Sequence, residues 1–398
     1  MRILFLSDTL PHSQVVSGVI IVNKRIRLLA ERGHQVGLAA FLRPGDEPHV
    51  PEVRAMVSDL ELLPPPRPRR ASCVAGLLTG SRPPPFCADY SPAMRETVGR
   101  MIERTHYQVV IAEFSVMGQY LYHNPYLPAV RRVISCHSCL TSSLEKSIRL
   151  QPWSQESLRR RIGRRALQTY EFSLYRSADR VLALTSEDKF DLLHYAPDLR
   201  ISVVPYGVDV EQFHPRNRTG DEEAIVCTGY YRQEPNSDAV LWFSRTVWPA
   251  LSRRWPNLKF YVVGRDPTRE MLELGRRNPR IIVTGTVEDV APYLAKARVY
   301  VCPMRLGTGF RGKILQAMAA GAPVVTTTLA AAGIPAHTGE NLLLANTPHT
   351  LLESINLLLE DEPLRRKLAA QARQLVESRF AWERCVDVLE RELRETLL

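Results

Sequence analysis

Apolar runs alternate with amphipathic stretches along most of the chain. The first run, Arg2–Ser7, is apolar enough for a strand buried on both faces, and residues 19–32 are predicted to form a helix that stops at Gly33. Further strands are predicted at 35–41, 107–114, 131–135, 180–185 and 201–205, and helices at 91–105, 155–176 and from residue 186 onward. The proline-rich stretch 61–85 is expected to be a surface loop.

The alternation stops at residues 209–223 and then begins again. This segment is polar, contains Pro215 and Gly220, and ends in three consecutive acids, which indicates a linker between domains. Strands are predicted after it at 224–228, 258–263, 280–284, 298–302 and 323–327. Helices are predicted at 238–254, 289–297 and 312–320, and a helical tail at 351–360, 363–378 and 382–397.

Repeated strand–helix units predict parallel sheets with helices on both faces. Two such sets on either side of a linker predict an α/β protein with two Rossmann-like domains and a cleft between them. In sheets of this kind ligands bind at the carboxyl ends of the strands, so the expected site faces the cleft.

Charge and cysteine content narrow the partners and the compartment. The net charge of +10 favours negatively charged partners, namely phosphates, nucleic acid or an anionic membrane. Residues 1–6 are apolar over too short a length for a signal peptide or a membrane span. Seven cysteines, an odd and sparse set, argue for a reducing cytoplasm, and the lone pair Cys136 and Cys139 is expected to be two buried thiols rather than a zinc or redox site.

A glycine-rich loop is the strongest candidate for chemistry. Gly307, Gly309 and Gly312 lie between a predicted strand and a predicted helix. The exposed N–H groups and the positive dipole end at such a helix start bind anions, and Arg311 and Lys313 add full positive charges. This loop is therefore predicted to bind phosphate.

Two other motifs partly match the same loop. A dinucleotide fingerprint requires an acidic residue about 20 positions on, but no Asp or Glu lies between Lys313 and Gly339. A Walker A loop requires Ser or Thr after the lysine to hold magnesium, but Ile314 stands there. A tight turn that merely needs glycine is the third alternative, and the neighbouring cations favour phosphate over it.

Seven segments in the same order resemble one known family. They are residues 29–36, 178–186, 203–209, 263–264, 284–297, 313–343 and 380–382. Together they resemble the GT-B glycosyltransferases of family 4. Within that family they most resemble the bacterial sugar transferases of surface-polysaccharide pathways. The resemblance covers nearly the whole chain.

The resemblance implies a retaining transfer of a sugar from a nucleotide-diphosphate sugar. The domains implied are an acceptor domain at 1–208, the linker at 209–223, a donor domain at 224–379 and a last helix at 380–398 that crosses back. The resemblance also implies an acceptor that is lipid-linked, a polysaccharide or other glycan, or a small molecule. Family members need no DxD metal motif and none is present, so neither a metal nor another cofactor is expected.

The resemblance also assigns donor-binding roles. Lys313 belongs to the donor loop, Arg232 stands where a diphosphate-binding cation is often found, and the Val287 backbone stands at the turn that meets the base. Gln316 and Thr308 replace two glutamates of the family motif, of which the one at 316 binds the donor ribose. An amide can still hydrogen-bond two hydroxyls but loses the charge-assisted strength, about 1 kcal/mol.

Two further residues are assigned in the first domain. Gly18 resembles the glycine turn near the donor phosphate and the acceptor. His137 stands where the family carries a histidine that faces the sugar, and we expect it to be catalytic by donating to a sugar hydroxyl or orienting the acceptor. The alternative for His137 is a histidine that is merely paired locally at a strand end.

A basic stretch at 159–165 suggests a further partner. It contains five arginines beside an apolar stripe in a predicted helix. Such a helix docks on anionic lipid, so peripheral contact with the inner membrane face is one interpretation and a solvated helix face is the other. No interleaved aromatics or recognised module point to nucleic acid.

The sequence leaves two alternatives to a glycosyltransferase open. A nucleotide-sugar-binding protein with weak catalysis, acting with a partner, is suggested by Gln316 and Thr308. A sugar-nucleotide epimerase or phosphorylase with the same shape is the other. The sequence does not name the sugar, the base or the acceptor, because such contacts come from variable loops.

Overall fold

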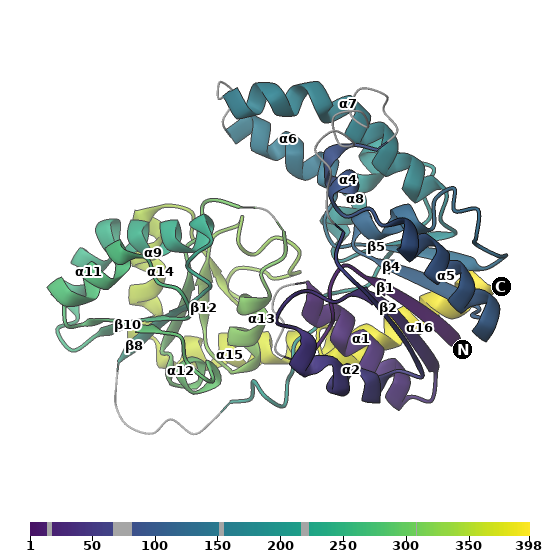
Figure 1. Cartoon of the computed structure of the whole chain (residues 1–398). Helices are drawn as coiled ribbons and strands as arrows, with labels where there is room; N and C mark the ends of the chain where they lie inside the picture. The colour runs from purple at the N-terminus through teal and green to yellow at the C-terminus, as the bar shows by residue number, and fades with distance from the viewer. Residues whose placement is uncertain (14–17, 67–81, 151–154, 216–222, 308) are drawn as a thin grey trace. The chain divides into compact units, whose positions relative to one another are not determined.

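The computed structural model describes residues 1–13, 18–66, 82–150, 155–215, 223–307 and 309–398, and for residues 149, 150, 155–160 and 162 it describes the backbone alone. Contacts divide the chain into two compact units, which we call unit 1 (Met1–Pro205 with Val386–Leu398) and unit 2 (Tyr206–Cys385). Figure 1 shows the helices and strands of both.

Unit 1 is built on a parallel sheet. Among the described residues it has seven strands in the order β3-β2-β1-β4-β5-β6-β7. They are β1 (Arg2–Ser7), β2 (Gln35–Phe41), β3 (Asp59–Leu63), β4 (Val109–Glu113), β5 (Arg131–Cys136), β6 (Arg180–Ala183) and β7 (Ile201–Val203). The strand order reverses between β1 and β4. The strands β2 and β3 lie on one side of β1, and the chain then crosses to β4 on its other side.

Helices cover both faces of this sheet. They are α1 (Val19–Glu31), α2 (Val50–Met56), α4 (Pro84–Ala88), α5 (Pro92–Thr105), α6 (Leu140–Leu150), α7 (Gln155–Arg176) and α8 (Ser186–Tyr195), with short 3₁₀ turns at Glu47–His49 and Ser115–Tyr120. Alternate residues of β1 enter the two cores, Leu4 and Leu6 on one face and Ile3 and Phe5 on the other. Burial on both faces explains why this strand is a continuous apolar run.

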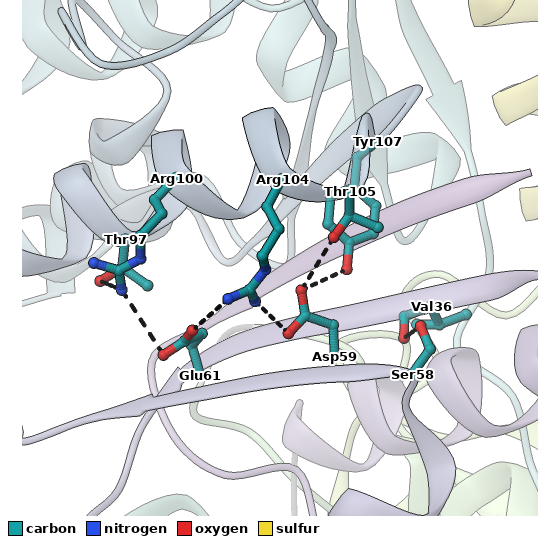
Figure 2. A network of polar contacts seen from close by, with 9 residues as sticks. All are labelled: Val36, Ser58, Asp59, Glu61, Thr97, Arg100, Arg104, Thr105 and Tyr107. Carbon is teal, nitrogen blue, oxygen red and sulfur yellow. Dashed lines mark hydrogen bonds and ion pairs between the residues drawn. The ribbon is translucent and has the colours of Figure 1, made fainter.

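The edge strand β3 corrects the loop that the proline-rich composition predicted from residue 61. β3 is only partly buried, and two of its five residues are acidic. Figure 2 shows how they are held: the Arg104 guanidinium donates to Asp59 at 2.6 Å and to Glu61 at 3.4 Å, and the Tyr107 hydroxyl donates to Asp59 at 3.3 Å. These long-range partners stabilise a strand that its own hydrophobic pattern does not predict.

Unit 2 repeats the architecture. Among its described residues the parallel sheet has six strands in the order β10-β9-β8-β11-β12-β13. They are β8 (Ala224–Thr228), β9 (Lys259–Val263), β10 (Ile281–Gly285), β11 (Val299–Cys302), β12 (Val324–Thr326) and β13 (Leu343–Leu344). Two cores again take alternate residues, with Val226 on one face and Ile225 on the other. The prediction of an α/β protein with two Rossmann-like domains is therefore confirmed.

The helices of unit 2 differ from the prediction in two places, at 238–254 and at Arg269–Arg277, where no helix was predicted. They are α9 (Glu234–Thr246), α10 (Trp248–Arg254), α11 (Arg269–Arg277), α12 (Ala291–Lys296), α13 (Gly312–Ala319), α14 (Pro348–Glu360), α15 (Glu362–Arg379) and the start of α16 (Trp382–Leu397). The single helix predicted at 238–254 is two helices, α9 and α10. Pro249 lies in the first turn of α10, where its missing N–H is tolerated, whereas inside one continuous helix it would remove a hydrogen bond.

The last helix has residues in both units. It begins at Trp382 in unit 2, and Val386, Leu389 and Leu393 belong to the hydrophobic core that contains Ile3 and Phe5 of unit 1. Arg180 of β6 donates to Glu392 at 2.6 Å, which adds an ion pair to this apolar contact. Among the described residues, no helix is long and apolar enough to cross a membrane.

Candidate functional site

The strand order reverses between β8 and β11 in unit 2, and ligands bind at such points in open α/β sheets. The loop that leaves β11 there runs into α13 and contains the predicted glycines. Gly307 and Gly309 have φ of +95° and +85°, a region that side chains with a Cβ rarely adopt. Gly312 is required for a different reason, because a Cβ there would lie 2.7 Å from the Tyr206 ring.

Lys313 lies in the first turn of α13 and ties the loop to β8. Its ammonium donates to the Asn236 amide oxygen at 2.7 Å and to the Thr228 carbonyl at 3.2 Å. Both partners are neutral, and no carboxylate in the described part of the chain forms an ion pair with this lysine. Because the ammonium has a third N–H and its charge is not cancelled, it can still bind an anion at the helix start.

Two arginines of the same loop have structural contacts. Arg305 forms a bidentate ion pair with Asp238, at 2.7 and 2.8 Å, so its charge is already neutralised. Arg311 lies against the loop backbone, since it donates to the Gly309 carbonyl and a Cβ on Gly307 would be 2.9 Å from its guanidinium. Burial lowers the pKa of Arg311. Arg311 therefore shapes the loop that Lys313 follows.

The other predicted donor residues lie on segments that follow β8, β10 and β11 of unit 2. Arg232 is exposed on the loop after β8, and its side chain has no hydrogen bond or ion pair within the described residues. Gln316 lies half-buried on α13, one turn beyond Lys313. Val287 follows β10, which is two strands from β8, and packs on the unit 2 core. Thr308 lies outside the described residues.

His137 of unit 1 follows β5, as predicted. Its Nε2 lies 2.8 Å from a carboxylate oxygen of Glu113, and its side chain is 9% exposed. The other ring nitrogen, Nδ1, is buried and has no hydrogen-bond partner among the described residues. The ring packs on Phe114 with centroids 4.2 Å apart.

Gly18 and Phe114 lie against this histidine. A Cβ on Gly18 would be 2.9 Å from His137 Nδ1 and 2.9 Å from the Phe114 ring, so close approach rather than backbone conformation requires glycine here. Phe114 has φ of +69°, an uncommon conformation for a bulky residue that is found most often at functional sites. The structure thus brings Gly18 and His137 together.

Sequence reasoning missed the pair behind His137. Arg25 of α1 is 2% exposed and Glu113 of β4 is fully buried, and Arg25 donates to both Glu113 oxygens at 2.9 and 3.1 Å. Burial alone would raise the pKa of Glu113, but Arg25 and His137 together lower it to about 2. A charged residue within the apolar face of α1 and another inside the apolar strand β4 were the available signals.

Asp8, directly after β1, was also missed. Its Oδ1 is buried and has no hydrogen-bond partner in the described residues, while Oδ2 lies 3.6 Å from Arg43. Burial raises the pKa of Asp8 despite Arg43, and nearby Asp89 raises it further. A carboxyl group with a raised pKa at the carboxyl end of a strand is typical of a functional position.

The two cysteines of the CxxC pair are buried thiols, as expected. Cys136 is fully buried and Cys139 is 5% exposed. Burial raises the pKa of the Cys136 thiol to about 12 and raises that of Cys139 as well, so neither is a thiolate at neutral pH. Within the described residues, no group of three His, Cys, Asp or Glu side chains is placed to hold a metal ion.

The basic stretch is only partly described. The side chains of Arg159 and Arg160 lie outside the described residues. Arg161 and Arg165 are exposed on α7, whereas Arg164 is half-buried and donates to Glu145 at 2.6 Å. At least one positive charge of this stretch is therefore neutralised by an ion pair between α7 and α6.

Two family models match the chain. One, described as Glycosyltransferase Family 4, matches residues 22–212, and the other, described as Glycosyl transferases group 1, matches residues 222–361. A D-inositol 3-phosphate glycosyltransferase of Geodermatophilus obscurus is 27% identical over 394 residues, which cover 91% of this chain and 81% of that protein. A phosphatidyl-myo-inositol mannosyltransferase of Mycolicibacterium smegmatis is 28% identical over 192 residues, 45% of this chain and 48% of that protein.

Solved structures share the fold over the full length. Anabaena Alr3699/HepE in complex with UDP has a TM-score of 0.71 at 16% identity and covers 99% of this chain and 100% of its own. Sucrose-phosphate synthase from Thermosynechococcus elongatus has a TM-score of 0.68 at 18% identity and covers 99% of both chains. At such identities the likeness shows the fold alone.

Proposed function

Since this chain belongs to the GT-B glycosyltransferases and is of the family 4 type, we propose that it moves a sugar from a nucleotide-diphosphate sugar to an acceptor hydroxyl with retention of configuration. One observation carries the proposal furthest. The uncancelled ammonium of Lys313, held by Asn236 and Thr228, lies at the start of α13 beside a loop with two positive-φ glycines. This arrangement suits a diphosphate.

The donor would lie along the carboxyl edge of unit 2. Lys313 and the first N–H groups of α13 bind the diphosphate and stabilise the charge that develops on it as the sugar leaves. Arg232, exposed on the neighbouring loop, adds a second cation. The Gln316 amide hydrogen-bonds the ribose hydroxyls, and the backbone at Val287 meets the base.

The acceptor would bind at unit 1. His137, whose Nδ1 has no hydrogen-bond partner among the described residues, contacts a substrate hydroxyl, and Gly18 lies beside the ring. Related proteins are named for inositol phosphate, phosphatidylinositol or diphosphoundecaprenol acceptors. We propose an acceptor of the same breadth, a glycan or polyol that is free or lipid-linked.

Two features of the reaction setting are part of the proposal. Cationic side chains and a helix N-terminus, rather than a bound metal or cofactor, neutralise the diphosphate. The basic stretch of α7 contacts an anionic membrane surface on the cytoplasmic side. Flotation with anionic vesicles tests the second feature: replacing Arg159, Arg160 and Arg161 by Glu should abolish binding, and undiminished binding would contradict it.

The function is tested with a panel of nucleotide sugars. We expect one donor to release its nucleoside diphosphate when extract-derived acceptors are present, and calorimetry to show that the same nucleotide diphosphate binds. Binding without turnover of any donor would contradict the enzyme. Absence of both binding and turnover would contradict the donor site as well.

A further inference from the structure

Three elements of unit 1 bring one polar cluster together. Glu113 at the end of β4 pairs in register with Ser135 of β5, so their side chains are neighbours on the same face of the sheet. His137 lies two residues beyond Ser135, just past the end of β5, and its Nε2 lies 2.8 Å from Glu113. Arg25 of α1 packs against them and donates through one nitrogen to Ser135 Oγ at 2.8 Å and to Glu113 at 2.9 Å.

The charge state of this cluster is defined by its contacts. Glu113 is fully buried and stays ionised because Arg25 lies against it and His137 shares its other oxygen. An ionised carboxylate has no hydrogen to donate, so it can only accept. The hydrogen in the 2.8 Å contact must therefore be on Nε2 of His137.

The hydrogen on Nε2 determines what the opposite ring nitrogen, Nδ1, can bind. A neutral imidazole that carries its hydrogen on Nε2 has a lone pair on Nδ1 and accepts there. Nδ1 is the ring nitrogen next to Gly18, where a Cβ would lie 2.9 Å from it, and it is buried without a hydrogen-bond partner among the described residues. A buried acceptor without a partner is unusual unless a ligand completes it.

We infer that Glu113, clamped by Arg25, is a positioning residue that fixes the protonation of His137, so that Nδ1 accepts a hydrogen bond from a substrate hydroxyl. This inference rests on the proposed function, because it names the chemistry that His137 offers at that site. The ligand group must be a donor, such as a sugar or polyol hydroxyl. A phosphate oxygen, which only accepts, would not pair with Nδ1 of a ring in this neutral form.

The variant Glu113→Gln reverses this chemistry with little change of shape. Arg25 can only donate, so the Gln oxygen stays on Arg25 and the amide N–H₂ turns toward His137 Nε2. The ring then accepts on Nε2 and carries its hydrogen on Nδ1, where it can no longer accept. Glu113→Asp keeps an acceptor-only group and serves as the conservative variant.

The experiment measures ¹⁵N shifts of the histidine nitrogens together with transfer kinetics. The His137 signals are identified by their loss in His137→Asn. We expect hydrogen on Nε2 in the wild type and in Glu113→Asp, and on Nδ1 in Glu113→Gln, whose kcat falls about 10- to 100-fold with little change in the donor KM. Glu171→Gln is the matched control, because Glu171 is also a fully buried acceptor of unit 1 but binds Thr141 and Tyr175 instead.

The results test the positioning role of Glu113 and the proposed function separately. Hydrogen on Nδ1 in the wild type, whether alone or together with hydrogen on Nε2, overturns the inference. The same tautomer in the wild type and in Glu113→Gln, or an unchanged kcat after the tautomer has switched, overturns the positioning role. An equal loss in Glu171→Gln shows a general effect of losing a buried carboxylate and also overturns it. A wild type that turns over no donor contradicts the proposed function, whereas the nitrogen shifts still decide how His137 is protonated. If Glu113→Gln does not fold, a wild type or Glu113→Asp with hydrogen on Nδ1 overturns the inference.

Discussion

The Lys313 ammonium lies 2.7 Å from the amide oxygen of Asn236, so the cation at the start of α13 is held by a neutral partner. The Thr228 carbonyl, its other acceptor, is neutral too. By contrast, the nearby Arg305 is neutralised by Asp238. This difference selects Lys313 over Arg305 as the cation available to an anionic ligand.

Replacing Lys313 by Ala should weaken the binding of a nucleoside diphosphate about 10- to 100-fold, because a hydrogen bond to a charged group contributes about 1.5–3 kcal/mol. Isothermal titration calorimetry measures this change. Lys367→Ala is the matched control, since that lysine is exposed on α15 of the same unit. Equal affinities in both variants and in the wild type would refute the role of Lys313.

The variant Gly18→Ala should lower both stability and activity. Its Cβ would be 2.9 Å from both His137 Nδ1 and the Phe114 ring, so one of the two rings must move. Overpacking costs about 1–3 kcal/mol of unfolding free energy, and a displaced His137 should reduce kcat about 100-fold. Thermal melting and steady-state kinetics separate the two effects. A variant with wild-type kcat would show that the close approach of Gly18 to His137 is not needed for activity.

The variant Asp8→Asn should stabilise the protein at neutral pH. Burial raises the folded-state pKa of Asp8 above its usual 3.8, so its contribution is fully present below pH 3.8 and is lost as the pH rises through the folded-state value. Asparagine mimics the protonated form, and we expect a rise in Tm on the order of 1–3 °C at pH 7 that disappears toward pH 4. Glu103→Gln, at an exposed position, is the control. A lower Tm at pH 7, or a difference independent of pH, would contradict the assignment.

Removing divalent metal should leave the transfer rate unchanged. In the proposal the diphosphate is neutralised by Lys313, Arg232 and the α13 N-terminus, so no ion is required. The measurement compares turnover before and after treatment with EDTA, and then after adding magnesium or manganese. A loss with EDTA that magnesium restores would show that a metal takes part.

The alternation of apolar and amphipathic segments was enough to predict the buried strands of both sheets, because parallel strands buried on two faces are continuous apolar runs. The glycine loop before Lys313 was also predictable, since positive φ and a helix start leave a local pattern. Edge strand β3 was not, because its acidic residues depend on Arg104 of α5. Local sequence does not contain such a partner.

The cluster behind His137 shows the same limit within the site. His137 was identified through a family resemblance, but Arg25 and Glu113 meet across 88 positions of sequence. Their pairing depends on how α1 packs on β4, which hydrophobic periodicity does not specify. Likewise Asp8 gains its raised pKa from burial, a property of the folded unit.

We propose that this chain transfers a sugar from a nucleotide sugar with retention of configuration. The most direct measurement follows the anomeric proton signals by NMR while an α-configured nucleotide sugar is consumed in the presence of acceptor. We predict that the first new glycoside signal has the α configuration and that it appears more slowly in Lys313→Ala. A β-configured first product would contradict retention, and no consumption of any donor in the panel would contradict the transferase itself.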